Sequence, residues 1–546
     1  MSLPPIAGSL NTLRFDNRFT RDLPGDARAD NVPRQVHGAC FSRVRPLQVR
    51  EPLLLAHASE VAGGILGLSQ EEVLSPAFTA VFSGNEVLEG MDPFAMCYGG
   101  HQFGHWAGQL GDGRAINLGA VATDSGEHWT LQLKGAGPTP YSRTADGFAV
   151  LRSSVREFLC SEAMHHLGVP TTRALSLVTT GEEVLRDMFY DGNAQNEPGA
   201  VVCRVARSFT RFGNFQLPAA RGETELLRKL VDHTIRCDFP HLDAPTEGAL
   251  SPALYLRWFE DVCRRTSTMI LHWMRVGFVH GVMNTDNMSI LGETIDYGPY
   301  GWLEDHDPQW TPNTTDAGQR RYCYGNQASI AHWNLVQLAT AIAGLMDGDT
   351  DPLVHVLKVY PDTYAANWRA MMLTKLGLES TKAAADQALL DELLEVLSLL
   401  ETDMTLFYRC LAKIQVEAVL SSEASDTEVC AGLTDAYYQP AELQGEAAAR
   451  SAKWIRSYAA RIQTQGTPDE LREKRMNEVN PIYVLRNYQA QLAIDASVKG
   501  DHSQIAALLD VLRRPYDERE GLEDYAAKRP EWARHKPGCS MLSCSS

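Results

Sequence analysis

The sequence lacks a long hydrophobic run, an excess of basic residues and any C-x-x-C pair of cysteines. No apolar run approaches the ~20 residues that a helix needs to cross a bilayer, so no membrane partner is expected. The net charge of −18 at pH 7 argues against general binding to nucleic acids or to anionic membrane surfaces. The eleven cysteines are scattered and include no C-x-x-C pair, which is typical of a reducing compartment. Because the first residues also have no signal-peptide pattern, we expect a cytoplasmic protein.

Hydrophobic periodicity divides the chain into a β-rich first half and a helical second half. Alternating residues predict strands near 129–134, 174–178 and 201–206, and an apolar stripe predicts a helix over 151–167, with Ser153 or Ser154 as its N-cap. From about Leu226 the pattern is helical. Besides the helix over 151–167, the predicted helices cover residues 51–68, 254–276, 333–346, 383–420, 441–463 and 483–512. We therefore expect an α+β fold.

Two short polar loops near the middle of the chain carry the clearest chemical signal. Asp286 and Asn287 end the first, His280-Gly-Val-Met-Asn-Thr-Asp-Asn287, and Asp296 lies in the second, Thr294-Ile-Asp-Tyr-Gly298. A few hard oxygen ligands close together suit Mg²⁺ or Mn²⁺, with phosphate oxygens completing the shell. Protein kinases hold their metals with one Asn and one Asp on two such loops. The catalytic Asp of a kinase would fall at Val282, so the metal ligands are present and the usual base is absent.

Upstream motifs favour a phosphate-binding site over an ordinary polar hairpin. A glycine-rich run over residues 97–120 includes Gly111-Asp-Gly113-Arg114, whose backbone N–H groups and guanidinium suit phosphate oxygens. Lys134 then ends a predicted strand, the position where a kinase-like fold keeps its phosphate-binding lysine. The loop over residues 135–147 is rich in Gly and Pro and is typical of a lid or binding loop.

Two acids on the predicted helix over 151–167 are candidate partners of Lys134. These are Glu157 and Glu162, and the sequence does not choose between them. Such a pair would hold the ammonium group where it contacts phosphates. Arg204, Arg207 and Arg211 follow within eight residues, and this density of guanidinium groups in an acidic chain indicates a bound polyanion.

Taken together, these motifs resemble the SelO family (selenoprotein O, also called YdiU) of protein adenylyltransferases, which have a pseudokinase fold. The resemblance covers nearly the whole chain. Its strongest motifs are Leu110-Gly-Asp-Gly-Arg114, Leu131-Gln-Leu-Lys-Gly135, Arg156-Glu-Phe-Leu-Cys-Ser-Glu-Ala-Met164, His280-Gly-Val-Met-Asn-Thr-Asp-Asn287 and Ile295-Asp-Tyr-Gly298. The resemblance implies a protein-kinase-like two-lobed fold. The implied divisions are an N-terminal extension (1–80), an N-lobe (81–215), a helical C-lobe (216–535) and a cysteine-containing tail (536–546).

The resemblance also implies an activity, the transfer of AMP from ATP to Ser, Thr or Tyr hydroxyls of proteins. It implies Mg²⁺ or Mn²⁺ on Asn287 and Asp296, with Asp286 as the proton acceptor and Glu157 as the partner of Lys134. The nucleotide would lie flipped relative to its position in a kinase, with its α-phosphate exposed to attack. The implied nucleotide-binding residues are Gly111, Gly113, Arg114, Lys134, Asp146, Gly147, Glu157, Arg204, Arg211 and Asp296.

Alternative functions are compatible with the same residues. They are the transfer of UMP, phosphoryl transfer of the kinase type, and a nucleotide-binding scaffold without catalysis, which the valine at position 282 suggests. Some bacterial members of the family resemble redox-controlled enzymes in which a tail cysteine bonds one in the loop after D-Y-G. That loop has no cysteine here over residues 307–313, so a bridge between Cys544 and Cys323 is the remaining hypothesis.

Overall fold

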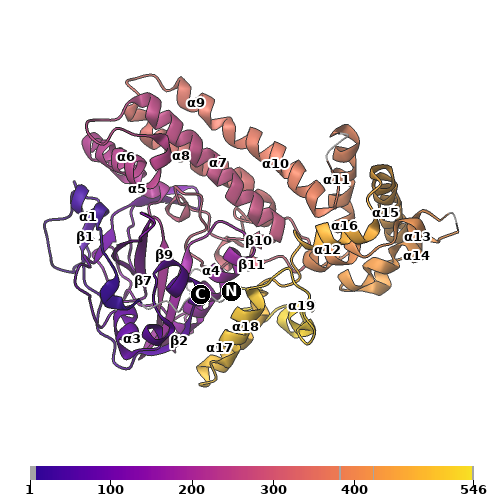
Figure 1. The fold of residues 1–546 in the computed structure, drawn as a ribbon, viewed down its shortest axis with the longest axis horizontal. Helices are drawn as coiled ribbons and strands as arrows, with labels where there is room; N and C mark the ends of the chain where they lie inside the picture. Colours follow the sequence, from indigo (N-terminus) through magenta and orange to yellow (C-terminus); the bar gives the residue numbers. More distant parts are fainter. Residues whose placement is uncertain (1–7, 380–382, 422, 544–546) are drawn as a thin grey trace.

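The computed structural model describes residues 8–379, 383–421 and 423–543. Within them, an antiparallel sheet is combined with many helices (Figure 1). Seven strands form this sheet in the order β1-β3-β6-β7-β9-β8-β2, and every neighbouring pair is antiparallel. The strands are β1 (Phe41–Arg43), β2 (Leu53–His57), β3 (Phe94–Met96), β6 (Ala115–Ala122), β7 (His128–Lys134), β8 (Arg173–Arg186) and β9 (Gln195–Ala206). The α+β class predicted from the sequence is confirmed.

The first part of the chain supplies both edge strands of this sheet, and the helix predicted over 51–68 is wrong. That segment contains β2, which pairs with β8, and a short π-helical turn over Glu60–Ile65. Pro52 and the pair Gly63-Gly64 disfavour a continuous helix, and pairing with β8 satisfies the backbone instead. Helix α3 (Pro76–Ser83) then buries Phe78 and Phe82 in the same core as the apolar side chains of β6 and β7.

Helix α4 (Leu151–His166) packs against β8 and β9, as the pattern over 151–167 predicts. Its N-cap is Val150 rather than Ser153 or Ser154. Val150 has an extended backbone and forms a bridge with Gly199, so the edge of β9 determines where the helix begins. The Ser153 hydroxyl donates to the Val150 carbonyl from inside the first turn.

A layer of helices lies across one end of the sheet (Figure 1). Its members are α5 (Phe212–Ala220), α6 (Thr224–Asp238), α7 (Pro252–Val276), α8 (Gln327–Ile342), α9 (Asp351–Leu357) and α10 (Val359–Lys375). The Ser251 hydroxyl caps α7, and Gly277, with φ of +76°, ends it in the left-handed conformation. The long helix predicted over 254–276 is therefore confirmed, whereas the helix predicted over 333–346 begins earlier, at Gln327.

A second group of helices projects away from the sheet and has its own apolar core (Figure 1). It comprises α11 (Ala383–Leu397), α12 (Met404–Ala412), α13 (Val416–Leu420), α14 (Asp426–Cys430), α15 (Gly445–Gln465) and α16 (Asp469–Asn477). The helix predicted over 383–420 is thus three helices, and the one predicted over 441–463 is α15. No helix in the described ranges is long and apolar enough to span a membrane.

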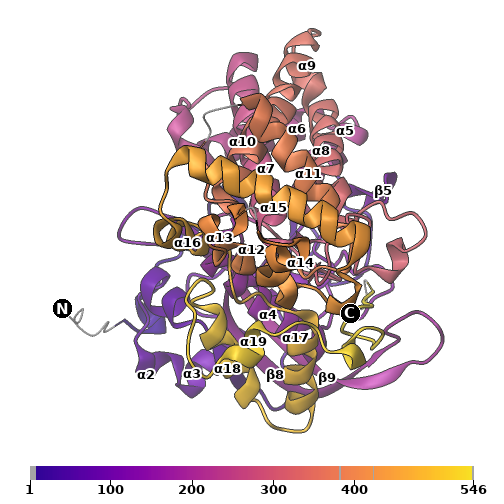
Figure 2. The ribbon, with the colours of Figure 1, turned by 90° about the vertical axis from the view of Figure 1, so that its right-hand side faces the viewer.

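The C-terminal helices return to the sheet and pack on α4 (Figures 1 and 2). They are α17 (Asn487–Val498) and α18 (Ser503–Leu512), which replace the single helix predicted over 483–512. The buried Arg156 of α4 links the parts further, because its guanidinium donates to the Tyr300 carbonyl at 2.7 Å and to the Asn487 side chain at 3.4 Å. Helix α4 is therefore held from the sheet side and from the helical side at once.

Candidate active site

A cavity of about 890 Å³ lies where the sheet meets the helical part of the chain. The site residues predicted from the sequence line it, apart from Glu157, Glu162 and Arg207. The lining residues among them are Gly111, Gly113, Arg114, Lys134, Asp146, Gly147, Arg204, Arg211, Asp286, Asn287 and Asp296. Strands β7 and β9, the glycine-rich segment and the two central loops thus converge on one space. Arg207 is exposed and lies outside the cavity, so the prediction of three arginines at one polyanion site holds for Arg204 and Arg211 only.

Lys134 is the last residue of β7, and its ammonium group lies 2.6 Å from Glu157 Oε2 on α4. Both side chains are buried, and Glu157 sits behind the lysine rather than on the cavity wall. Burial lowers the pKa of Lys134, while the charge of Glu157 acts to raise it. Glu162 instead forms a two-bond ion pair with Arg173, at 2.9 and 2.7 Å. The structure therefore selects Glu157 from the two candidate partners.

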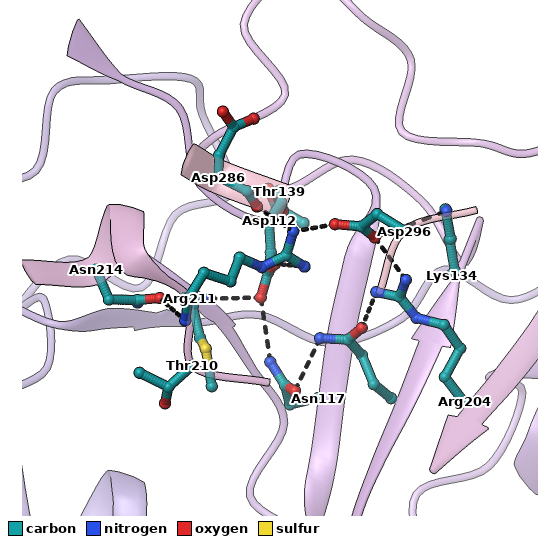
Figure 3. Close-up of polar contacts among 12 residues, drawn as sticks. Asp112, Asn117, Lys134, Thr139, Arg204, Thr210, Arg211, Asn214, Asp286 and Asp296 are labelled. Atoms are coloured by element: carbon teal, nitrogen blue, oxygen red, sulfur yellow. Dashed lines mark hydrogen bonds and ion pairs between the residues drawn. The ribbon is translucent and has the colours of Figure 1, made fainter. Parts of the chain in front are cut away.

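Asp296 lies at the centre of three cationic side chains (Figure 3). Its carboxylate accepts from Arg204 Nη1 at 2.6 Å and from Arg211, and Lys134 Nζ is 3.8 Å away. Burial acts to raise the pKa of Asp296, but Arg211, Arg204 and Lys134 together hold it well below its usual value. The residue adopts φ of +60°, a conformation uncommon for an aspartate. The carboxylate is therefore ionised and held in a fixed direction.

A chain of buried polar side chains connects the two arginines beneath the cavity. Arg204 donates to Gln132, whose amide donates to Asn117 at 2.9 Å, and Asn117 donates to Asp112 at 3.2 Å. Asp112 Oδ1 in turn lies 3.6 Å from Arg211, and Figure 3 shows this arrangement. Burial raises the pKa of Asp112 although Arg211 acts against it.

Sequence analysis did not assign this network. The sequence indicates this network only through the alternation of side chains along β7, which places Gln132 on the same face as Lys134. The pairing of β6 with β7 then sets Asn117 directly opposite Gln132. Buried polar residues at facing positions are evident only once the strand register is known.

The loop that follows β10 (Phe278–Val279) carries Asp286 and Asn287 in a short 3₁₀ turn, Thr285–Asn287. The Asn287 amide donates to the Val282 carbonyl at 2.9 Å, which leaves its Oδ1 oxygen as an acceptor for a ligand. Asp286 is buried, and its Oδ2 accepts from Gln102 at 3.3 Å. Its Oδ1 has no hydrogen-bond partner among the described residues. Burial raises the pKa of Asp286 to about 6.

Two of the glycines that line the cavity, Gly111 and Gly147, allow its loops to pack closely against neighbouring residues. A Cβ atom on Gly111, where φ is +93°, would lie 2.5 Å from the Tyr141 ring, and one on Gly147 would lie 2.2 Å from the Pro138 nitrogen. Asp146 is half-exposed and pairs with Arg186 at 2.6 Å, and these hydrogen bonds lower its pKa against the opposing effect of burial. These positions therefore shape the outer wall of the cavity.

The hypothesis of a bridge between Cys323 and Cys544 falls partly outside the described residues, because Cys544 is not among them. Cys323 is a buried free thiol, and burial raises its pKa. The chain just before the tail cysteine does approach the loop after D-Y-G, since the Thr314 amide donates to the Leu542 carbonyl at 2.7 Å.

Comparisons with known proteins show which proteins this chain is similar to. A family model described as "Protein adenylyltransferase SelO" matches residues 33–513. A protein of Rhodopirellula baltica named protein nucleotidyltransferase YdiU is 60% identical over 540 residues, which are 98% of this chain and 99% of that protein. A protein of Azoarcus sp. with the same name is 57% identical over 537 residues, which are 98% of this chain and 100% of that protein.

Substitution of each buried glutamate on α4 separates a role in the cavity from a role in stability. Glu157→Gln and Glu162→Gln each remove the nearest carboxylate partner of a buried cation, so each is expected to lower the free energy of unfolding by about 3–5 kcal/mol. Only Glu157→Gln releases Lys134 and is expected to weaken nucleotide binding. Denaturant unfolding and calorimetric titration with ATP measure the two effects. Equal nucleotide affinity in the two variants would contradict this role of Glu157.

Proposed function

This chain belongs to the SelO family of protein nucleotidyltransferases, and from that membership we propose that it transfers AMP from ATP to hydroxyl groups of Ser, Thr or Tyr in proteins, with release of pyrophosphate. The observation that carries the proposal is the convergence of Lys134, Arg204 and Arg211 on Asp296 at one cavity. Attack at phosphorus builds negative charge on phosphate oxygens, and fixed cations in a buried site stabilise that charge.

The proposed architecture is a protein-kinase-like one of two lobes with the cavity between them. In this division, residues 1–80 are an N-terminal extension, 81–215 the N-lobe, 216–535 the helical C-lobe and 536–546 a tail. The position of Lys134 at a strand end, paired with Glu157 on helix α4, which packs on β8 and β9, supports the proposal. The ten cysteines among the described residues are free thiols, which supports a cytoplasmic location.

The oxygen-only ligand set of Asn287 and Asp296 fits Mg²⁺ or Mn²⁺. Asn287 has a free Oδ1, Asp296 is held ionised, and both line the cavity. Mg²⁺ is commonly bound by one or two protein carboxylates together with substrate phosphates. Such an ion would supply further neutralisation of the phosphate oxygens. The two oxygens of Asp296 already accept from Arg204 and Arg211, so these arginines orient the carboxylate from behind.

Asp286 is the proposed acceptor for the proton of the attacking hydroxyl. Val282, at the position of the kinase base, has no titratable group, whereas Asp286 has a carboxylate and is one of the residues that line the cavity. Its Oδ1 has no hydrogen-bond partner among the described residues and lies against Gly100, where an added Cβ would be 2.5 Å away. Figure 3 shows its carboxylate pointing away from Asp296, so the two acids are free to serve different ligands. Gln102 donates to the other Asp286 oxygen and holds the side chain in place. A positioned carboxylate of this kind contributes about 10²–10⁴-fold to a rate.

The remaining lining residues are proposed to bind the nucleotide itself. Gly111, Gly113 and Arg114 come from the glycine-rich segment, and Asp146 and Gly147 come from the loop over residues 135–147. The proposed orientation leaves the α-phosphate open to the incoming hydroxyl. Lys134, Arg204 and Arg211 then meet the negatively charged phosphate chain.

Labelled nucleotides distinguish AMP transfer from its alternatives. Incubation of the purified chain and protein acceptors with ATP labelled at the α-position is expected to label protein, whereas γ-labelled ATP is expected to label none. Label from the γ-position would show phosphoryl transfer instead. Efficient labelling from α-labelled UTP, with none from α-labelled ATP, would show UMP transfer. Mass spectrometry of the labelled proteins identifies the acceptor residues.

Replacement of the proposed base tests its role directly. Asp286→Asn keeps the shape of the side chain and removes its basicity, so kcat is expected to fall by about 10²–10⁴-fold. ATP affinity, measured by calorimetry, is expected to stay close to that of the unsubstituted chain because the cationic residues are unchanged. A kcat within threefold of the original value would contradict the assignment.

The metal concentration that activity requires tests whether Asn287 is a metal ligand, without a change to the buried charges around Asp296. Asn287→Ala removes one oxygen ligand and leaves Asp296 and its arginines intact, so we expect the concentration of Mg²⁺ or Mn²⁺ needed for half-maximal activity to rise at least tenfold. The affinity for ATP without a divalent ion is expected to be unchanged. An unaltered metal requirement would show that Asn287 is not a ligand.

A further inference from the structure

A second group of potential metal ligands lies far from the cavity, between the N-terminal segment and the helical layer. Asp22 ends the short helix α1 (Arg18–Asp22), and His233 and Cys237 lie four residues apart on α6. Residues at that spacing share one face of a helix. Helix α1 packs on α6, as Figure 1 also shows at the left of the view. The chain therefore brings a carboxylate, an imidazole and a thiol together from segments about 200 residues apart in sequence.

The ligand atoms of this group have nearly the separations that a tetrahedral zinc ion requires. His233 Nδ1 lies 3.7 Å from Asp22 Oδ2 and 3.7 Å from Cys237 Sγ, and the three atoms all lie within 4.8 Å of one another. Around tetrahedral zinc, usual bond lengths place N and O about 3.4 Å apart and N and S about 3.6 Å apart. The two distances from His233 exceed these values by a few tenths of an ångström, and Asp22 and Cys237, which lie within 4.8 Å of each other, would have to reach an O to S separation of about 3.6 Å.

We propose that Asp22, His233 and Cys237 form a zinc site that joins α1 to α6. Zinc accepts this mixture of oxygen, nitrogen and sulfur, and with three protein ligands its fourth position is taken by water. Asp22 is half-exposed, so solvent reaches that side of the group. The proposal does not depend on nucleotidyl transfer, because none of the three residues lines the cavity.

The surroundings of the three residues suit a bound ion. Burial lowers the pKa of His233 to about 4, so the imidazole is neutral and its nitrogen is available at neutral pH. Burial raises the pKa of Cys237 to about 11, and bound zinc would displace the thiol proton. Arg21 donates to both oxygens of Asp22, to Oδ1 at 2.8 Å and to Oδ2 at 3.4 Å. These hydrogen bonds orient the carboxylate, and an ion would share Oδ2 with the guanidinium. Arg18 and Arg236 act in the opposite sense, since their positive charge disfavours a dication.

Another group in the described residues, Glu60 with His165 and His166, is less suited to an ion. The histidine nitrogens lie 4.0 and 3.9 Å from Glu60 Oε2, and the guanidinium of Arg173 lies closer, at 3.7 Å from the same oxygen. A guanidinium contacts the acid in both groups, because Arg21 lies 3.4 Å from Asp22 Oδ2, and the distances from histidine to the acid are longer in the Glu60 group. The group of Asp22, His233 and Cys237 also contains a thiol, which increases its preference for zinc.

Cobalt substitution provides a direct test, because a cobalt–thiolate bond gives a charge-transfer absorption that oxygen and nitrogen ligands do not. The full-length chain, freed of metal with a chelator under reducing conditions, is titrated with Co²⁺ and then with Zn²⁺. We expect one thiolate-bound Co²⁺ per chain, displaced by one equivalent of Zn²⁺. We also expect Zn²⁺ to raise the melting temperature, since an ion bound only by the folded state stabilises it.

Matched cysteine variants decide which thiol is the ligand. Cys237→Ser is expected to lose the absorption and the zinc-dependent rise in melting temperature. Cys410→Ser is expected to keep both, because Cys410 is a similarly half-buried thiol with its pKa raised to about 11, yet it belongs to no ligand group found in the described residues. Asp22→Asn, near the surface, is expected to weaken zinc at least tenfold and serves as the second variant if Cys237→Ser does not fold.

The proposal has clear contrary outcomes. Absence of the thiolate absorption in the unsubstituted chain would overturn it, as would an absorption that persists in Cys237→Ser. Equal zinc affinity in Asp22→Asn and the unsubstituted chain would remove Asp22 from the site and with it the link between α1 and α6. Binding to the oxygen ligands of the cavity cannot imitate the expected result, because that set contains no thiol.

Discussion

The ion-pair cluster around Asp296 is the interaction on which the rest of the site depends. Three cations, Lys134, Arg204 and Arg211, are buried beside one another, and isolated burial of each would cost several kcal/mol. Asp296 and Glu157 supply two negative charges, which leaves one positive charge in excess before Asp112 is counted. Asp112 is a third acid, 3.6 Å from Arg211, and burial raises its pKa. Protonation of Asp112 would leave the cluster with one surplus positive charge, which suits a polyanionic phosphate chain.

The charged side chains of this cluster come from different elements of the fold, and the packing of these elements fixes their relative positions. Lys134 ends β7, Arg204 lies near the end of β9, and Glu157 comes from α4, which the C-terminal helices α17 and α18 hold against the sheet. A displacement of any one element would leave a buried charge without its partner, and that penalty resists movement. Distant parts of the chain therefore contribute to the geometry of the cavity without lining it.

Sequence patterns predicted the local features well and the long-range partners poorly. The strand end at Lys134 and the helix that carries Glu157 follow from periodicity within a few residues. The choice of Glu157 over Glu162 does not, because the docking angle of α4 decides which of the two faces β7. The supposed helix over 51–68 failed for the same reason, since β8 provides hydrogen-bond partners that no local pattern reveals. Asp112, Asn117 and Gln132 similarly acquire their roles only from strand register.

The two proposed metal sites differ in ligand chemistry, and that difference decides which metal ion each site would prefer. Divalent zinc binds most protein ligand sets more tightly than magnesium or manganese does, so a site meant for the weaker ions must offer little that zinc prefers. The cavity presents only amide and carboxylate oxygens at Asn287 and Asp296, and the two arginines bonded to Asp296 further disfavour a tightly held dication there. Nitrogen and sulfur ligands are instead gathered at His233 and Cys237, neither of which lines the cavity. In the two proposals, the hard and soft ligands are therefore separated, so an ion that arrives with the nucleotide would not compete with zinc for the same site.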